Sequence, residues 1–159
     1  MGQHCEHKGL RSAEIVDGKL SLVLNNTLAA VEEGRSAIAQ FLGPLDCMVQ
    51  NRLEVVFEEL VSNTVRHGFA GNSGHSIHVL VERAPDAIRL TFEDDGLPFD
   101  PTKVDVEALM AGTEPTRLGG LGIPLIVRLS NSLSYERLSP GKEREGFRPR
   151  NRTTVSVKT

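Results

Sequence analysis

The sequence lacks an excess of positive charge. Its 18 lysine and arginine residues are outnumbered by 21 aspartate and glutamate residues, and the formal net charge is -3. The basic side chains are scattered except between Lys142 and Arg152, where arginines alternate with Pro and Gly in a pattern typical of a solvated loop. The composition therefore gives no indication of direct nucleic-acid binding.

Cysteine and long apolar runs are also scarce. The two cysteines, Cys5 and Cys47, form no C-x-x-C pair and no disulfide framework, which is typical of a reducing compartment. The first residues contain no apolar core of the kind that a signal peptide needs, and no later stretch approaches the length of a membrane span. We therefore expect a cytoplasmic protein without a membrane partner.

The remaining composition is that of one globular domain. Hydrophobic residues make up 39% and charged residues 25% of the 159 residues, enough for a single core. We expect residues 1–18 to be a flexible tail and residues 19–159 to be the domain. His4, Cys5 and His7 could hold a transition metal, but no fourth ligand is nearby, so a tail without a metal is the favoured interpretation.

The spacing of apolar residues predicts strands and helices in a mixed order. Period-two alternation indicates strands, whereas apolar spacings of three and four residues indicate helices. We predict strands over 19–24, 77–81, 88–92, 132–138 and 153–158, and helices over 28–42, 47–68, 104–110 and 123–129. Asn25-Asn26-Thr27 and Asp46 are expected to cap the first two helices. The interrupted stretch from Leu97 to Arg117 is a candidate lid.

This order of elements favours an α+β fold. Strands that are adjacent in sequence favour antiparallel pairing, with the helices packed on one face. We therefore predict a two-layer sandwich with a mixed, mostly antiparallel sheet.

Three short motifs contain the residues that could carry chemistry. Glu59, Asn63 and His67 are spaced four apart, which places an acid, an amide and an imidazole along one edge of the long helix. Such spacing is also common on solvated helices. Asp94-Asp95-Gly96 ends an apolar strand, and Gly119-Gly120-Leu121-Gly122 precedes a helix whose N-terminus could face an anion. Each of the last two motifs could alone be a turn or a tightly packed loop.

In this order, the three motifs resemble the N, G1 and G2 boxes of the GHKL (Bergerat-fold) superfamily of ATPases and kinases. The strings FEELVSNTVRHGF, FEDDGLPFDP and GGLGIPLIVRL are most similar to the RsbW/SpoIIAB-type anti-sigma-factor serine/threonine kinases. The resemblance covers approximately residues 20–157. Pro98 stands where many members of the superfamily carry a second glycine, although proline is familiar in the anti-sigma branch.

The resemblance implies ATP and Mg²⁺ as cofactors and a role for each matching residue. Asn63 would hold Mg²⁺, and Glu59 would be the catalytic base or water-orienting carboxylate. Asp94 would accept a hydrogen bond from the adenine amine, and Gly96 would leave room for the ring. The remaining residues, expected near the phosphates, are His67, Arg117, Gly120 and Gly122.

The resemblance also implies a function and partners. The chain would phosphorylate a serine or threonine of a STAS-type antagonist and exchange this partner with a sigma factor, with the kinase pairing as a homodimer. One alternative is a regulatory module that binds ATP or ADP and acts by partner capture without catalysis. Another is the detached ATP-binding domain of a two-component system, although the chain shows no upstream helix carrying a phosphoacceptor histidine.

Overall fold

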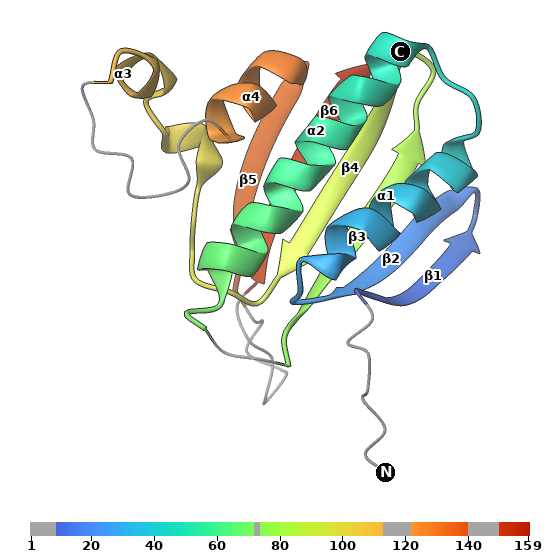
Figure 1. Cartoon of the computed structure of the whole chain (residues 1–159), viewed down its shortest axis with the longest axis horizontal. Helices are drawn as coiled ribbons and strands as arrows, with labels where there is room; N and C mark the ends of the chain where they lie inside the picture. The colour runs from blue at the N-terminus through green and yellow to red at the C-terminus, as the bar shows by residue number, and fades with distance from the viewer. Residues whose placement is uncertain (1–8, 72–73, 113–121, 140–149) are drawn as a thin grey trace.

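The computed structural model describes residues 9–71, 74–112, 122–139 and 150–159 (Figure 1). These residues form one six-stranded sheet with the order β1-β2-β3-β4-β6-β5. The strands are β1 (Leu10–Val16), β2 (Lys19–Asn25), β3 (Ser76–Arg83), β4 (Ala87–Asp94), β5 (Ser132–Leu138) and β6 (Arg150–Lys158). The helices are α1 (Ala29–Leu42), α2 (Cys47–Asn63), the π-helix η1 (Thr64–Gly68), the 3-10 helix η2 (Pro101–Lys103), α3 (Val106–Met110) and α4 (Gly122–Leu129).

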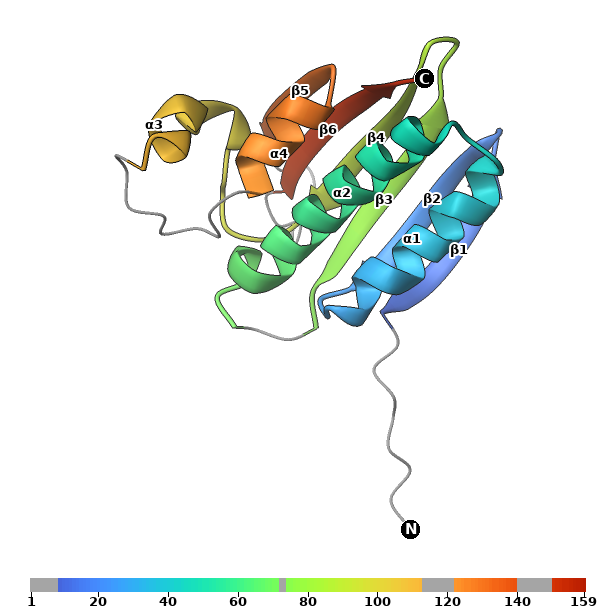
Figure 2. The ribbon, with the colours of Figure 1, turned by 45° about the horizontal axis from the view of Figure 1, so that its top comes forward.

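Helices α1, α2 and α4 cover one face of the sheet, as Figures 1 and 2 show from two directions. This confirms the two-layer α+β fold with a mostly antiparallel sheet. All five strand pairings among the described residues are antiparallel. Two helices separate β2 from β3, so the chain returns to the end of the sheet at which β2 stopped and β3 runs in the opposite direction.

The core lies between the sheet and the helices. Alternate residues of the central strands point toward the helices and are buried. These are Leu20, Leu22, Leu24, Ile77, Val79, Val81, Ile88, Leu90, Phe92, Val155 and Val157. From α2, Phe57 packs beside Phe92 with ring centroids 6.0 Å apart. Because each such buried side chain contributes about 1.5–3 kcal/mol, this layer holds α2 against the sheet.

The opposite face of the sheet is polar. Cross-strand ion pairs link Lys19 to Glu82 at 2.6 Å and Arg152 to Glu93 at 2.8 Å. In the central strands β2, β3, β4 and β6, the alternation therefore makes one face part of the core and turns the other away from it.

Strand β1 corrects the prediction of a flexible tail over residues 1–18. Leu10–Val16 pairs with β2 through a turn at Asp17 and Gly18, where φ is 51° and 72°. Two positive φ values in a two-residue turn match the twist of a β-hairpin, and Asp-Gly favours them. The strand was missed because most of its residues are exposed and show no buried alternation. Residues 1–8, which include His4, Cys5 and His7, lie outside the described residues.

Two helix ends also differ from the predictions. Helix α1 begins after Leu28, and no side chain caps it, so the predicted cap at 25–27 is wrong. Asp46 does cap α2, because its side chain accepts a hydrogen bond from the amide of Met48. The predicted single helix over 47–68 is α-helical only to Asn63 and then widens into the π-turn η1. The predicted helix at 104–110 is reduced to α3.

Candidate functional site

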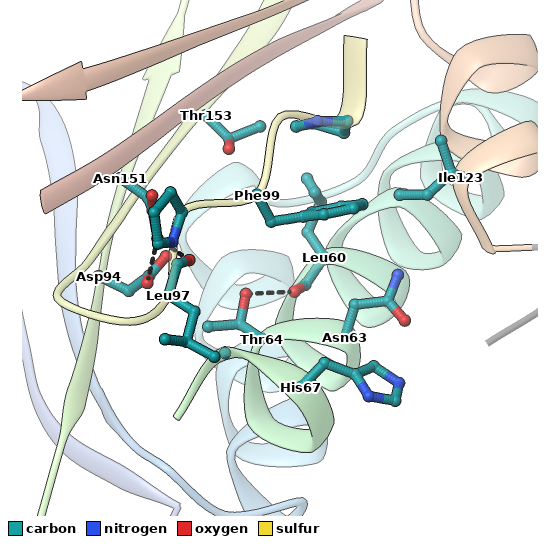
Figure 3. Close-up of a pocket in the computed structure, with 13 residues that line it drawn as sticks. Leu60, Asn63, Thr64, His67, Asp94, Leu97, Phe99, Ile123, Asn151 and Thr153 are labelled. Atoms are coloured by element: carbon teal, nitrogen blue, oxygen red, sulfur yellow. Dashed lines mark hydrogen bonds between the residues drawn. The ribbon is translucent and has the colours of Figure 1, made fainter. Parts of the chain in front are cut away.

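A cavity of about 260 Å³ lies where α2, η1, α4 and the adjoining ends of β4 and β6 meet. This volume is slightly below the range of about 300–1,000 Å³ that is typical of small-molecule pockets, and it suits the base of a nucleotide. Most of the lining is apolar, from Leu60, Leu97, Pro98, Phe99, Pro101 and Ile123. The polar lining side chains are Asn63, Thr64, His67, Asp94, Asn151 and Thr153 (Figure 3).

Asp94 is the carboxylate of this lining. It ends β4 and is 9% exposed. Its Oδ1 accepts hydrogen bonds from the Gly96 amide at 2.9 Å and from Asn151 Nδ2 at 2.8 Å. Burial raises the pKa of Asp94, while the hydrogen bonds from Asn151 and Gly96 act in the opposite direction. The cavity therefore contains one buried carboxylate in a mainly apolar wall.

Asn151 and its neighbours on β5 were missed in the sequence. Asn151 Oδ1 accepts hydrogen bonds from Arg137 Nη1 at 2.6 Å and from the Tyr135 hydroxyl at 2.7 Å. The sequence does contain a signal for part of this set. Asn151 and Thr153 continue the inward alternation of Val155 and Val157, so they place polar side chains at core-facing positions of β6.

Gly96 is required by the protein's own backbone. A Cβ at this position would lie 2.4 Å from the Gly68 carbonyl oxygen and 2.8 Å from Asp94 Oδ1. The same carbonyl accepts a hydrogen bond from the Leu97 amide at 2.7 Å. The glycine thus lets the end of η1 close against the loop after β4, which holds Asp94 at the cavity wall.

Glu59 and Asn63 face the start of α4. A Cβ on Gly122 would lie 2.4 Å from Glu59 Oε2 and 3.1 Å from Asn63 Nδ2, so a side chain at this position would displace the Glu59 carboxylate. Asn63 and His67 line the cavity, whereas Glu59 lies beside it at the same helix start. His67 is exposed at the π-turn.

The structure therefore brings most of the predicted site residues together. Asn63, His67 and Asp94 line one cavity, and Figure 3 shows the first two on the helical wall opposite Asp94 and Asn151. Arg117 and Gly120 lie outside the described residues. Across residues 9–71, 74–112, 122–139 and 150–159, no three His, Cys, Asp or Glu side chains group as metal ligands. A metal held near Asn63 would therefore need ligands from a bound phosphate or water.

The family model of the histidine kinase-like ATPase domain matches residues 24–145 of this chain. The chain belongs to this family. Membership of the histidine kinase-like ATPase family implies ATP as the ligand, and the matched segment contains Glu59, Asn63, Asp94 and Gly122.

Two known proteins are similar to this histidine kinase-like ATPase domain. The Anti-sigma F factor of Oceanobacillus iheyensis is 25% identical over 101 residues, which cover 62% of this chain and 69% of that protein. The histidine kinase domain from the Erythrobacter litoralis EL346 blue-light activated histidine kinase is 16% identical with a TM-score of 0.44. That comparison covers 84% of this chain and 61% of the solved chain, so this chain spans less than two thirds of it.

None of the helices in the described ranges is both long and apolar enough to cross a membrane.

Proposed function

We propose that this chain is an ATP- and Mg²⁺-dependent protein serine/threonine kinase of the anti-sigma-factor type. The observation that carries the proposal is the buried carboxylate of Asp94 in a mainly apolar cavity, with the Asn63 amide on the opposite wall. Glu59 lies beside Asn63 at the start of α4. A mainly apolar cavity with one buried carboxylate as acceptor suits a purine base that carries an amine. The two polar side chains of α2 lie at the start of α4, and the N-terminus of a helix favours the binding of an anion such as a phosphate.

The base end of the site would select adenine through Asp94. Its Oδ1 already accepts two hydrogen bonds, and Oδ2 is the remaining strong acceptor for the adenine amine. Apolar side chains such as Leu60 and Ile123 would contact the faces of the ring. A guanine base, with a carbonyl oxygen at this position, would leave two acceptors facing each other.

The phosphate end would be organised by Asn63 and Glu59. Asn63 would offer its amide oxygen as a metal ligand, a donor type that Mg²⁺ accepts. Bound in this way, Mg²⁺ would supply positive charge that offsets the charge of the phosphates. Glu59 would take the proton of the attacking serine or threonine hydroxyl. The hydroxyl oxygen would bond to the γ-phosphorus as the bond to the β,γ-bridging oxygen breaks, which leaves ADP and a phosphoprotein.

The partners that we propose are a STAS-type antagonist as phosphate acceptor and a sigma factor as the competing ligand. Support comes from the 25% identity to a protein named Anti-sigma F factor. We also propose a homodimer through β1. This strand forms one edge of the sheet, and its Ile15 and Val16 are 64% and 56% exposed.

The test is transfer of phosphate from ATP to a STAS-type antagonist, with the modified residue located by mass spectrometry. We expect one phosphoserine or phosphothreonine that depends on Mg²⁺. Binding of ATP without transfer to any candidate antagonist would favour the alternative of a non-catalytic nucleotide-sensing module. Transfer to a histidine of another chain would instead indicate a two-component ATP-binding domain.

A further inference from the structure

Asn151 forms a complete set of hydrogen bonds behind Asp94. The residue is 5% exposed, and its Nδ2 donates to Asp94 Oδ1 at 2.8 Å and to the Leu97 carbonyl at 2.9 Å. Its Oδ1 accepts from Arg137 and Tyr135 of β5. An amide has two N–H donors and one oxygen with two lone pairs, so these four bonds use its full capacity.

The orientation of this amide follows from its partners. Arg137 is a donor only, so the Asn151 atom that it contacts must be the oxygen. The nitrogen must then face the two acceptors, Asp94 and the Leu97 carbonyl. Arg137 Nη1 also donates to the Gly96 carbonyl at 3.0 Å, which ties β5 to the loop that follows Asp94. The β5 side chains therefore determine how the amide is presented to the carboxylate.

The consequence for Asp94 concerns which of its oxygens can meet a ligand. Asn151 Nδ2 and the Gly96 amide both donate to Oδ1 of Asp94, which leaves Oδ2 as the acceptor for a base. Asn151 has no donor or acceptor left for the ligand, so it can act only through Asp94.

We propose that Asn151, oriented by Arg137 and Tyr135, is a positioning residue that makes the cavity selective for a 6-aminopurine over a 6-oxopurine. This inference rests on the proposed function, in which the cavity binds ATP. Without the amide, the Asp94 carboxylate can rotate about its side-chain bonds and loses one charge-assisted hydrogen bond. Selectivity depends on this geometry, since an acceptor that moves can no longer meet the amine in a fixed direction.

The charged and titratable groups around Asp94 come from several elements. Arg137 and Tyr135 approach from β5, Asp95 follows Asp94 directly after the end of β4, and His67 lines the cavity from η1. Of these, Arg137 lowers and Asp95 raises the pKa of Asp94. Replacing the Asn151 amide by a carboxyl group would put two acids in contact, and such a pair shares one proton.

The decisive variant is Asn151→Asp, compared with wild type by calorimetric titration of ATP and of inosine triphosphate, which has an oxygen in place of the amine. At pH 8 we expect the ATP affinity to fall about 10- to 100-fold, as for loss of a hydrogen bond to a charged group, and inosine triphosphate to change far less. Lower pH favours the form in which the two carboxyl groups share a proton, and a protonated carboxyl group at position 151 can donate to Asp94 as the amide did. We therefore expect ATP affinity to recover on acidification in this variant and not in wild type.

Asn131→Asp is the matched control. This exposed asparagine uses Oδ1 to accept a hydrogen bond from the Lys158 amide, which an aspartate can still accept, so the same change in charge leaves the contact intact. We expect wild-type selectivity at both pH values. Arg137→Met, compared with Arg152→Met on the polar face of the sheet, provides a second test if Asn151→Asp does not fold. The Arg137 variant should lose selectivity and the Arg152 variant should keep it.

The proposal and the function on which it rests can fail separately. If wild type binds ATP selectively and the folded Asn151→Asp and Arg137→Met proteins keep that selectivity at both pH values, the positioning role is overturned. If Asn151→Asp instead lowers the affinity for both nucleotides equally, without recovery at pH 6, Asn151 only stabilises the fold. If wild type itself binds neither nucleotide, the proposed function fails instead.

Discussion

On the β4–β6 wall of the cavity, Asp94 and Asn151 belong to a closed set of hydrogen bonds, whereas on the α2 wall Glu59 and Asn63 make no side-chain hydrogen bond to another described residue. Asp94 and Asn151 are buried and bonded to each other. For Glu59 and Asn63, the described part of the structure records no side-chain hydrogen bond, and both side chains are only partly buried. The first wall is organised before any ligand arrives, and the second keeps its donors and acceptors available.

This difference matches what each wall would do. Selection of a base needs an acceptor at a fixed position, because a misplaced acceptor cannot distinguish an amine from a carbonyl. Phosphate transfer needs groups that can engage a metal and a hydroxyl as charge develops. The π-turn that follows Asn63 also lies on the second wall, and π-turns are frequent at functional sites.

The substitution Glu59→Gln should have the largest effect, which is on the rate of phosphate transfer. The substitution keeps the size and helix preference of the side chain but removes its basicity, so phosphate transfer should fall by roughly 10²- to 10⁴-fold, as for loss of a general base. ATP affinity should change little. Single-turnover phosphorylation of the antagonist and nucleotide titration on the same preparation measure the two quantities.

Glu58→Gln is the matched control, because Glu58 is exposed on the same helix and faces Arg35 at 3.9 Å. It should transfer phosphate at the wild-type rate. Transfer by Glu59→Gln within a few fold of wild type would remove Glu59 as the base, and positioning would then have to account for the rate.

Asn63→Ala should remove the part of ATP affinity that depends on Mg²⁺. Loss of a group that only supports a metal ligand typically lowers metal affinity by approximately 10- to 100-fold. Loss of a direct ligand such as Asn63 should lower it by at least as much. The fold should persist, because alanine is the better helix former. Titrations with and without Mg²⁺ measure the effect, and Asn51→Ala at an exposed position of α2 is the control. A sharp drop in melting temperature with ATP binding retained would make Asn63 a structural residue.

Asp94→Asn should weaken ATP binding by about 1–3 kcal/mol, since an amide N–H₂ would face the adenine amine. Its Oδ1 can still accept from Asn151 and Gly96, so the protein without nucleotide should be no less stable than wild type. Titration with ATP, ADP and GTP checks the first expectation and thermal melting the second. Unchanged ATP affinity, or equal affinity of wild type for GTP, would contradict the assignment of this wall to adenine.

The smallest effect concerns the pH dependence of stability. Burial raises the pKa of Asp94 in the folded protein above its unfolded value of about 3.9. The resulting contribution to the free energy of unfolding is complete below the unfolded pKa and is lost as pH rises through the folded pKa. Relative to Asp94→Asn, wild type should therefore lose stability upward from about pH 4 until the folded pKa is passed. Urea denaturation of both proteins at a series of pH values measures this difference in the free energy of unfolding. If wild type instead becomes more stable than Asp94→Asn as pH rises, the hydrogen bonds to Asp94 outweigh the effect of its burial.

Much of the fold and part of the site could be predicted because the signals are local. The alternation in β3 and β4 and the apolar spacing of α2 report burial residue by residue along one element. Glu59 and Asn63 share a helix, so their spacing alone places them near each other. The strand β1 escaped prediction for the same reason, since an exposed edge strand such as Leu10–Val16 has no buried alternation to detect.

The amino-acid sequence by itself determined most of the elements, including the helix that carries Glu59 and Asn63 and the strand that ends at Asp94. Only the tertiary structure decided what surrounds that carboxylate. Asn151 lies 57 residues from Asp94 and meets it because β6 pairs with β4 in a register that makes the two residues partners. Arg137 then joins them because β5 pairs with β6 at Asn151. Local preferences do not encode register across strands, which is selected by burying the apolar face of the whole sheet.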